Sequence, residues 1–190
     1  MDNPGLLNNF WVAGSAAIVL YAVNYYLAFY AARAYRAGAN PLEVEGMFEW
    51  KNAFHEDPGR RLYFSPRLAW TLLFLAIGVV GVWWVTVQQN RLPGVFNFLM
   101  GGVILLEAID GLRHFRALVL FTLLAREGGI QGSAQVSHRL ALKLLFFELY
   151  GATAFLGLLF ALTLNWFFLG GALACFVQAR RQRDWALAAA

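Results

Sequence analysis

The chain has 190 residues, of which 60% are hydrophobic, 16% aromatic and only 14% charged. A soluble domain is nearer to about 45–50% apolar and about 25% charged, so this composition excludes an ordinary soluble globular protein. The formal net charge is +4, but the basic residues lie at the ends of apolar runs and do not alternate with aromatic residues, which argues against a nucleic-acid-binding surface. The single cysteine, Cys175, excludes an internal disulfide.

The apolar residues fall into runs of about 20 residues, which is the length that a helix needs to cross a hydrocarbon layer about 30 Å thick. Such runs must be helical, because lipid offers no partner for exposed N–H and C=O groups. We therefore predict an all-α, polytopic membrane helix bundle of about five transmembrane helices in a single domain. The expected spans are residues 10–32, 68–87, 95–116, 143–163 and 166–180.

The segments outside the spans differ in character. Residues 1–9 contain no basic stretch and no small-residue cleavage site, so we expect the first span not to be removed as a signal peptide. Residues 38–67 form a polar connection that we expect in the cytoplasm. Residues 88–94 read QQNRLPG, which is typical of a turn-rich linker.

The distribution of basic residues predicts the orientation of the chain. The segments after the first, third and fifth spans hold nearly all the Lys and Arg, whereas the N-terminal segment has none and the second connection has only Arg91. The positive-inside rule places the basic segments in the cytoplasm. We therefore expect a multi-pass protein of the cell membrane with its N-terminus outside and its C-terminus in the cytoplasm. The fifth run is short, so a tilted or re-entrant segment is the alternative there.

The third apolar run extends past a group of charged residues. An inner boundary at Arg113–Arg116, and another at Lys143, gives two spans of similar length and leaves residues 117–142 as a cytoplasmic helical hairpin. The hairpin still carries apolar side chains, namely Leu118, Val119, Phe121, Leu123, Leu124, Leu140 and Leu142. We expect residues 44–64 to cover them. Two alternatives remain open: this loop lies in the headgroup plane as an amphipathic helix, or the hairpin awaits a partner subunit.

Several polar residues are expected at one depth in the inner half of the membrane. Glu107, Asp110 and His114 are spaced i, i+3, i+7, which places them on one face of the third helix. Charged side chains within a span usually face the interior of the bundle. Counting inward from the basic boundaries gives a predicted buried polar cluster of Asn24, Glu107, Asp110, Arg113, His114 and Glu148.

The interpretation that we favour for this cluster is structural. Its three carboxylates are matched by three nearby basic residues, Arg113, Arg116 and Lys143, which suits a neutralised structural network, either alone or with a bound lipid headgroup. Long basic side chains can also reach lipid phosphates from the ends of the helices. The residues expected at this headgroup interface are Arg33, Arg36, Arg67, Arg116, Arg139, Lys143 and Arg180.

Two chemical interpretations stand beside the structural one. Intramembrane acids can mark a proton or cation path. A metal ion is the other alternative, since carboxylates and an imidazole suit Fe, Mn or Zn, although the Glu-x-x-His pattern of di-iron bundles is absent. The metal ligands would be Glu107, Asp110, His114 and Glu148. No other cofactor is expected.

These observations favour a small non-enzymatic membrane protein that acts as a subunit, an assembly factor or a lipid-interacting factor. The alternatives are a small oligomeric proton or cation transporter or channel, and an inner-leaflet enzyme with a carboxylate/His metal site. The expected partners are membrane lipids, with a homo-oligomer or a larger membrane complex as further alternatives, and no nucleic acid.

Overall fold

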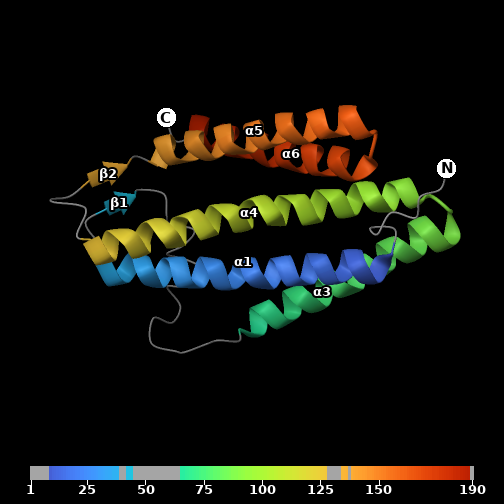
Figure 1. Ribbon diagram of the computed structural model, residues 1–190, viewed down its shortest axis with the longest axis horizontal. Helices are drawn as coiled ribbons and strands as arrows, with labels where there is room; N and C mark the ends of the chain where they lie inside the picture. The colour runs from blue at the N-terminus through green and yellow to red at the C-terminus, as the bar shows by residue number, and fades with distance from the viewer. Residues whose placement is uncertain (1–8, 39–41, 45–64, 128–133, 137, 189–190) are drawn as a thin grey trace.

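The computed structural model describes residues 9–38, 42–44, 65–127, 134–136 and 138–188 (Figure 1). Its elements in chain order are α1 (Phe10–Gly38), β1 (Leu42–Val44), α3 (Pro66–Trp83), the π-helix η2 (Trp84–Gln89), α4 (Pro93–Glu127), β2 (Ala134–Val136), α5 (His138–Thr163) and α6 (Trp166–Ala188). The helices run along the long axis of the molecule, with α3 inclined to the others (Figure 1).

Four helices among the described residues are long and apolar enough to cross a membrane. These segments are Phe10–Tyr35, Leu68–Gln89, Pro93–Leu124 and Leu140–Thr163. The prediction of a polytopic membrane helix bundle is therefore confirmed. The fifth predicted span does form a helix of 23 residues, α6, but it is not among the four, because the basic residues Arg180, Arg181 and Arg183 follow its apolar stretch closely.

The packing order of the helices differs from their order in the chain. Helix α4 packs against α1 on one side and α6 on the other, α5 packs against α6, and α3 packs mainly against α1. Helix α6 thus lies between α4 and α5 (Figure 1). The sequence suggested that α4 and α5 meet as the arms of a hairpin, but they are not among the closely packed pairs.

Glycines explain why α6 fits so closely against α4. A Cβ atom added at Gly101 would overlap the backbone carbonyl of Phe167, and one added at Gly170 would overlap that of Phe98. Small residues let transmembrane backbones approach in this way, so that van der Waals packing holds the helices together without a hydrophobic driving force. The close α4–α6 contact therefore depends on the absence of side chains at these positions.

The end of the bundle where α4 finishes is more elaborate than a simple hairpin. Helix α4 continues to Glu127 and α5 begins at His138, as expected, but β2 lies between them. Strand β2 pairs in parallel with β1, from Leu42↔Ala134 to Val44↔Val136, and so ties the connection after α4 to the one after α1. Two strands of three residues each thus accompany a fold that is otherwise helical, as expected.

The apolar arm of α4 is covered at one point by α1. Phe121 is only 1% exposed. It packs in a cluster with Ala31, and its ring lies edge-on to that of Tyr35 at 5.2 Å between centroids. Residues 45–64, most of the loop expected to cover this arm, lie outside the described residues. Their predicted role stays a prediction.

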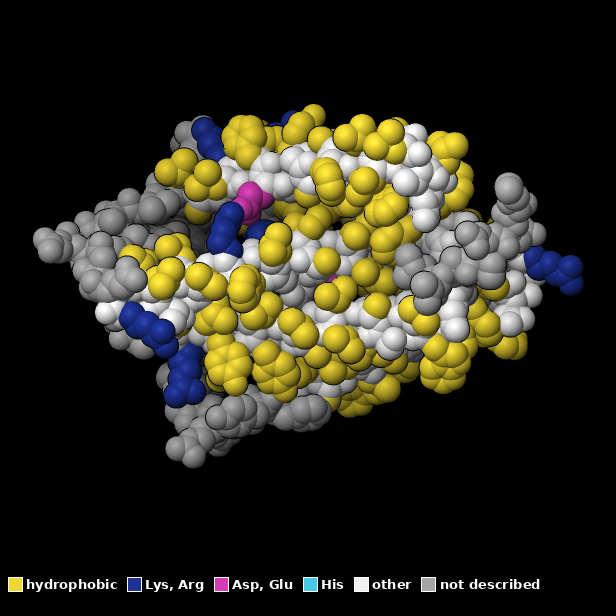
Figure 2. Space-filling view, in the orientation of Figure 1, with side chains coloured by type: hydrophobic (Ala, Val, Ile, Leu, Met, Phe, Trp, Pro, Cys, Tyr) yellow, Lys and Arg dark blue, Asp and Glu magenta, His cyan; other side chains and the backbone are white. Residues whose placement is uncertain are grey.

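Basic side chains gather toward one end of the bundle (Figure 2). Arg33 and Arg126 lie near the ends of α1 and α4, Lys143 lies in the second turn of α5, and Arg180 lies in the second half of α6. At the opposite end Arg91 lies in the connection between η2 and α4. Basic residues that are far apart in the sequence thus lie at the same end of the bundle, and the charge asymmetry seen along the chain becomes an asymmetry between its two ends.

Candidate functional site

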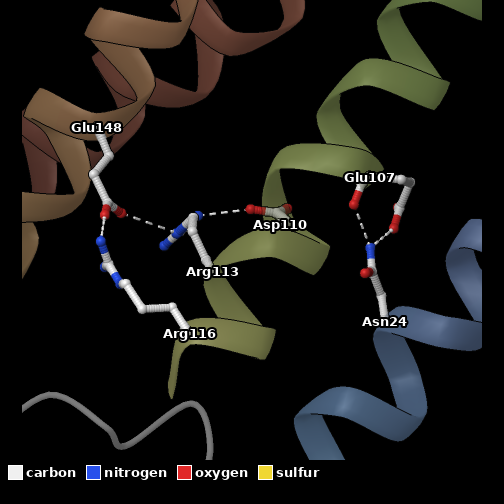
Figure 3. A network of polar contacts seen from close by, with 6 residues as sticks. All are labelled: Asn24, Glu107, Asp110, Arg113, Arg116 and Glu148. Carbon is white, nitrogen blue, oxygen red and sulfur yellow. Dashed lines mark hydrogen bonds and ion pairs between the residues drawn. The ribbon is translucent and has the colours of Figure 1, made fainter. Parts of the chain in front are cut away.

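The predicted polar cluster divides into two groups on different sides of α4 (Figure 3). Glu107 turns toward α1, whereas Asp110, Arg113 and Arg116 extend toward α5 (Figure 3). Residues three apart on a helix are neighbours, but each successive step rotates the side chain, so a helix held between two partners presents polar groups to both. One cluster in the sequence becomes two sites in the structure.

The first group is the contact between Asn24 and Glu107. The Asn24 Nδ2 donates hydrogen bonds to the backbone carbonyl of Glu107 and to its carboxylate Oε2, both at 2.6 Å. Asn24 is 7% exposed. Its Oδ1 rests against Gly111, where an added Cβ would collide with it. This pair fixes the register of α1 against α4, and the glycine makes room for it.

The second group links α4 to α5 through ion pairs. Arg113 Nη1 donates to Asp110 Oδ1 at 2.6 Å, and Arg113 Nε lies 3.5 Å from Glu148 Oε2. Arg116 Nη1 pairs with the other oxygen of Glu148. Arg113 therefore lies between two carboxylates, while Arg116 reaches across to α5 with 69% of its side chain exposed (Figure 3).

Three residues of the second group, Arg113, Arg116 and Glu148, line a groove of about 710 Å³ between α4 and α5. The groove exists because α6 holds the two helices apart. Figure 2 shows acidic and basic side chains together in a hollow with hydrophobic side chains around them. Its lining comprises the charged residues Arg113, Arg116 and Glu148 and the apolar residues Ile109, Leu112, Phe115, Val119, Leu120, Leu123 and Ala152.

The structure does not assemble the predicted metal ligands. Glu107 is engaged by Asn24, and Glu148 is engaged by two arginines. His114 is partly buried in α4 and is not part of the groove lining. Within the described ranges, no group of three or more His, Cys, Asp or Glu side chains could hold a metal ion.

The residues predicted at the headgroup interface have varied positions. Arg33, Arg116, Lys143 and Arg180 are all exposed. Only Arg116 among them lines the groove. The side chains of the remaining three, Arg36, Arg67 and Arg139, lie outside the described residues, so their predicted role is untested.

The groove itself is the feature that sequence reasoning missed. Its sequence signal is the pair of glycine doublets, Gly101-Gly102 and Gly170-Gly171, which permit α6 to insert beside α4. A second, smaller cavity of about 400 Å³ lies at the opposite end of the bundle and includes Arg91 and Trp166 in its lining. It was not anticipated either.

No protein-family model, curated protein or solved structure matches this chain. Its class therefore rests on its own helices, which are those of a small multi-pass integral membrane protein.

Proposed function

We propose that this chain is a non-enzymatic membrane protein that binds a membrane phospholipid in the groove between α4 and α5. The observation that carries the proposal is the combination of apolar walls with Arg113 and Arg116 in one cavity. Its volume of about 710 Å³ falls within the roughly 300–1,000 Å³ typical of ligand sites, which are mostly apolar with a few placed polar groups. Basic pockets between transmembrane helices are suited to lipid headgroups.

The proposed orientation places the basic end of the bundle in the cytoplasm and the N-terminus outside. The charge asymmetry between Arg91 and the clustered basic residues supports it. Arg116 lies ten positions before Arg126 on the continuous helix α4, which corresponds to about 15 Å along the axis. The headgroup of a bound inner-leaflet lipid would thus lie deeper in the membrane than the headgroups of the surrounding lipids. Apolar residues of the groove would lie on both sides of the charged side chains.

The partners of the carboxylates support binding over metal chemistry or a proton path. Asp110 is held by Arg113, Glu107 by Asn24, and Glu148 by Arg116. Acidic side chains that conduct protons or ions within a membrane need access to water and to groups with which they can exchange the proton or ion. Here each acid is engaged by a partner, within α4 for Asp110 and between two helices for Glu107 and Glu148, which suits a preorganised binding site.

The experiment fills the groove and measures retained lipid. Val119 lines the groove and is 40% exposed, so Val119→Trp should reduce the lipid that remains bound after detergent purification, as counted by native mass spectrometry. Ile77→Trp is the matched control, because Ile77 is 58% exposed on α3, away from the groove. We expect the control to retain as much lipid as the parent protein. Equal retention by both variants would refute the proposed site.

A further inference from the structure

We infer that the groove selects a zwitterionic phospholipid whose headgroup carries a primary amine, an inference that rests on the proposed lipid site. The phosphate would lie on Arg116 and the ammonium on Glu148, across the same ion pair that now links the two side chains. Three observations support this assignment: the charge balance of the site, the hydrogen-bonding state of Glu148, and the exposure of Arg116.

Among the residues that the structure describes, the charges of the groove lining and of its ion-pair partner Asp110 sum to zero. Arg113 and Arg116 are positive, and Asp110 and Glu148 are negative, and all four belong to one connected network. A net charge is costly at depth in a membrane, because hydrocarbon does not solvate it. A zwitterionic headgroup leaves the occupied site neutral, whereas an anionic headgroup would add an uncompensated negative charge beside Glu148.

Glu148 has an unused acceptor. Its Oε2 is shielded from solvent and accepts no hydrogen bond within the described part of the chain, since Arg113 Nε approaches it only as an ion pair at 3.5 Å. A buried acceptor without a donor is unfavourable by about 1–3 kcal/mol, and more for a charged group. A ligand that brings an N–H donor to this oxygen would remove that penalty.

Arg116 supplies the complementary half of the site. It contacts Glu148 through one nitrogen and remains 69% exposed. A guanidinium carries five N–H donors and binds phosphate oxygens with a fixed geometry. Arg116 can therefore donate hydrogen bonds to a phosphate while it stays near Glu148. A phosphate and an ammonium linked by two carbons would each meet a group of opposite charge, the phosphate the donors of Arg116 and the ammonium the acceptor oxygens of Glu148.

This assignment separates phosphatidylethanolamine from phosphatidylcholine, which has the same charge. A primary ammonium offers three N–H donors, whereas the quaternary ammonium of choline offers none. A hydrogen bond between two charged groups favours binding by roughly 1.5–3 kcal/mol, so loss of the donor should weaken binding by about tenfold or more.

The test uses the unmodified full-length protein and four dioleoyl lipids that differ only in methylation of the amine. These are phosphatidylethanolamine, its N-methyl and N,N-dimethyl derivatives, and phosphatidylcholine, with phosphatidylglycerol as an anionic probe. Binding is measured by titration with native mass spectrometry after delipidation in detergent. We expect affinity to fall about tenfold from the first to the last member, with the largest step where the last N–H is lost.

A substitution at Glu148 tests whether this side chain is responsible for the preference for a primary amine. Glu148→Gln should reduce the preference for phosphatidylethanolamine over phosphatidylcholine to less than about threefold, since the charge-assisted part of the hydrogen bond is lost. Asp184→Asn is the matched control, because it removes the same charge from an exposed position on α6 that is outside the groove. The control should keep the full preference. If Glu148→Gln does not fold, the methylation series decides the question alone.

The outcomes separate this inference from the proposed function. Equal binding of all four lipids, still blocked by Val119→Trp, would overturn the amine selectivity and leave the lipid site standing. Tighter binding of phosphatidylglycerol would also overturn it and assign an anionic headgroup. Failure of every lipid to bind would refute the proposed function itself.

Discussion

Arg116 of α4 pairs with Glu148 of α5 across a gap between two helices that do not pack closely against each other. Arg113 contacts the same carboxylate and also Asp110, so the connection is a small network and not a single bridge. Because α6 keeps the helices apart, these side chains span an accessible groove instead of filling an interface. The network can therefore contribute both to stability and to ligand binding.

The contribution of the ion pair between Arg116 and Glu148 to stability can be tested with a double-mutant cycle. Glu148→Gln should destabilise the protein, because it leaves two arginines without their shared carboxylate. The double variant Glu148→Gln/Arg116→Gln should recover part of the loss, by about 1 kcal/mol. Arg116 is the suitable partner, since removing Arg113 would also deprive Asp110 of its ion pair. Thermal unfolding in detergent measures the effect. Strictly additive single-variant effects would show that the pair is not coupled.

The glycine contact between α4 and α6 predicts a strong effect from one methyl group. Gly170→Ala should destabilise the protein by several kcal/mol or prevent folding, because the new Cβ would overlap the carbonyl of Phe98. Gly151→Ala on α5 is the control, because a Cβ there meets nothing within 4 Å. In a helix that change should be neutral or stabilising by up to about 1 kcal/mol. Equal melting temperatures for both variants would contradict the close packing.

The contact between α1 and α4 predicts a role for a single amide. Asn24→Ala should destabilise the protein by about 1–3 kcal/mol, because the partly buried Glu107 carboxylate would lose its hydrogen-bond donor. Ser15→Ala is the control, since Ser15 is exposed and bonds only within its own helix in the described structure. Denaturant-induced unfolding of both variants gives the comparison. Equal free energies of unfolding for the two variants would show that the contact between Asn24 and Glu107 does not contribute to stability.

The charge asymmetry predicts the labelling pattern in whole cells. With Cys175 replaced by alanine, a cysteine at position 91 should react with an impermeant maleimide in intact cells. A cysteine at position 185 should react only after permeabilisation, because it follows the basic segment of α6. The reverse pattern would invert the proposed orientation.

The sequence alone determined that this chain is a membrane helix bundle, and it placed the helices closely. Phe10, Pro93 and Trp166 begin helices near the predicted starts, because the length of an apolar run and the need to satisfy backbone hydrogen bonds are local properties. The prediction that Asp110 and Glu148 lie at a similar level came from counting along the same helices, and Arg113 contacts both of them. These features need no knowledge of which helix neighbours which.

The tertiary structure alone decided which polar residues meet. Glu107 bonds to Asn24, and Glu148 to Arg116, because α4 is held between α1 and α6 and presents a different face to each side. The insertion of α6 depends on glycine contacts with backbone atoms about 70 residues away in sequence, and the pairing of β1 with β2 joins residues that are 92 positions apart. The sequence of a helix gives the directions of its side chains relative to one another, but it does not say which neighbouring helix each side chain faces. The groove therefore arises from the packing of the helices, which local sequence patterns do not encode.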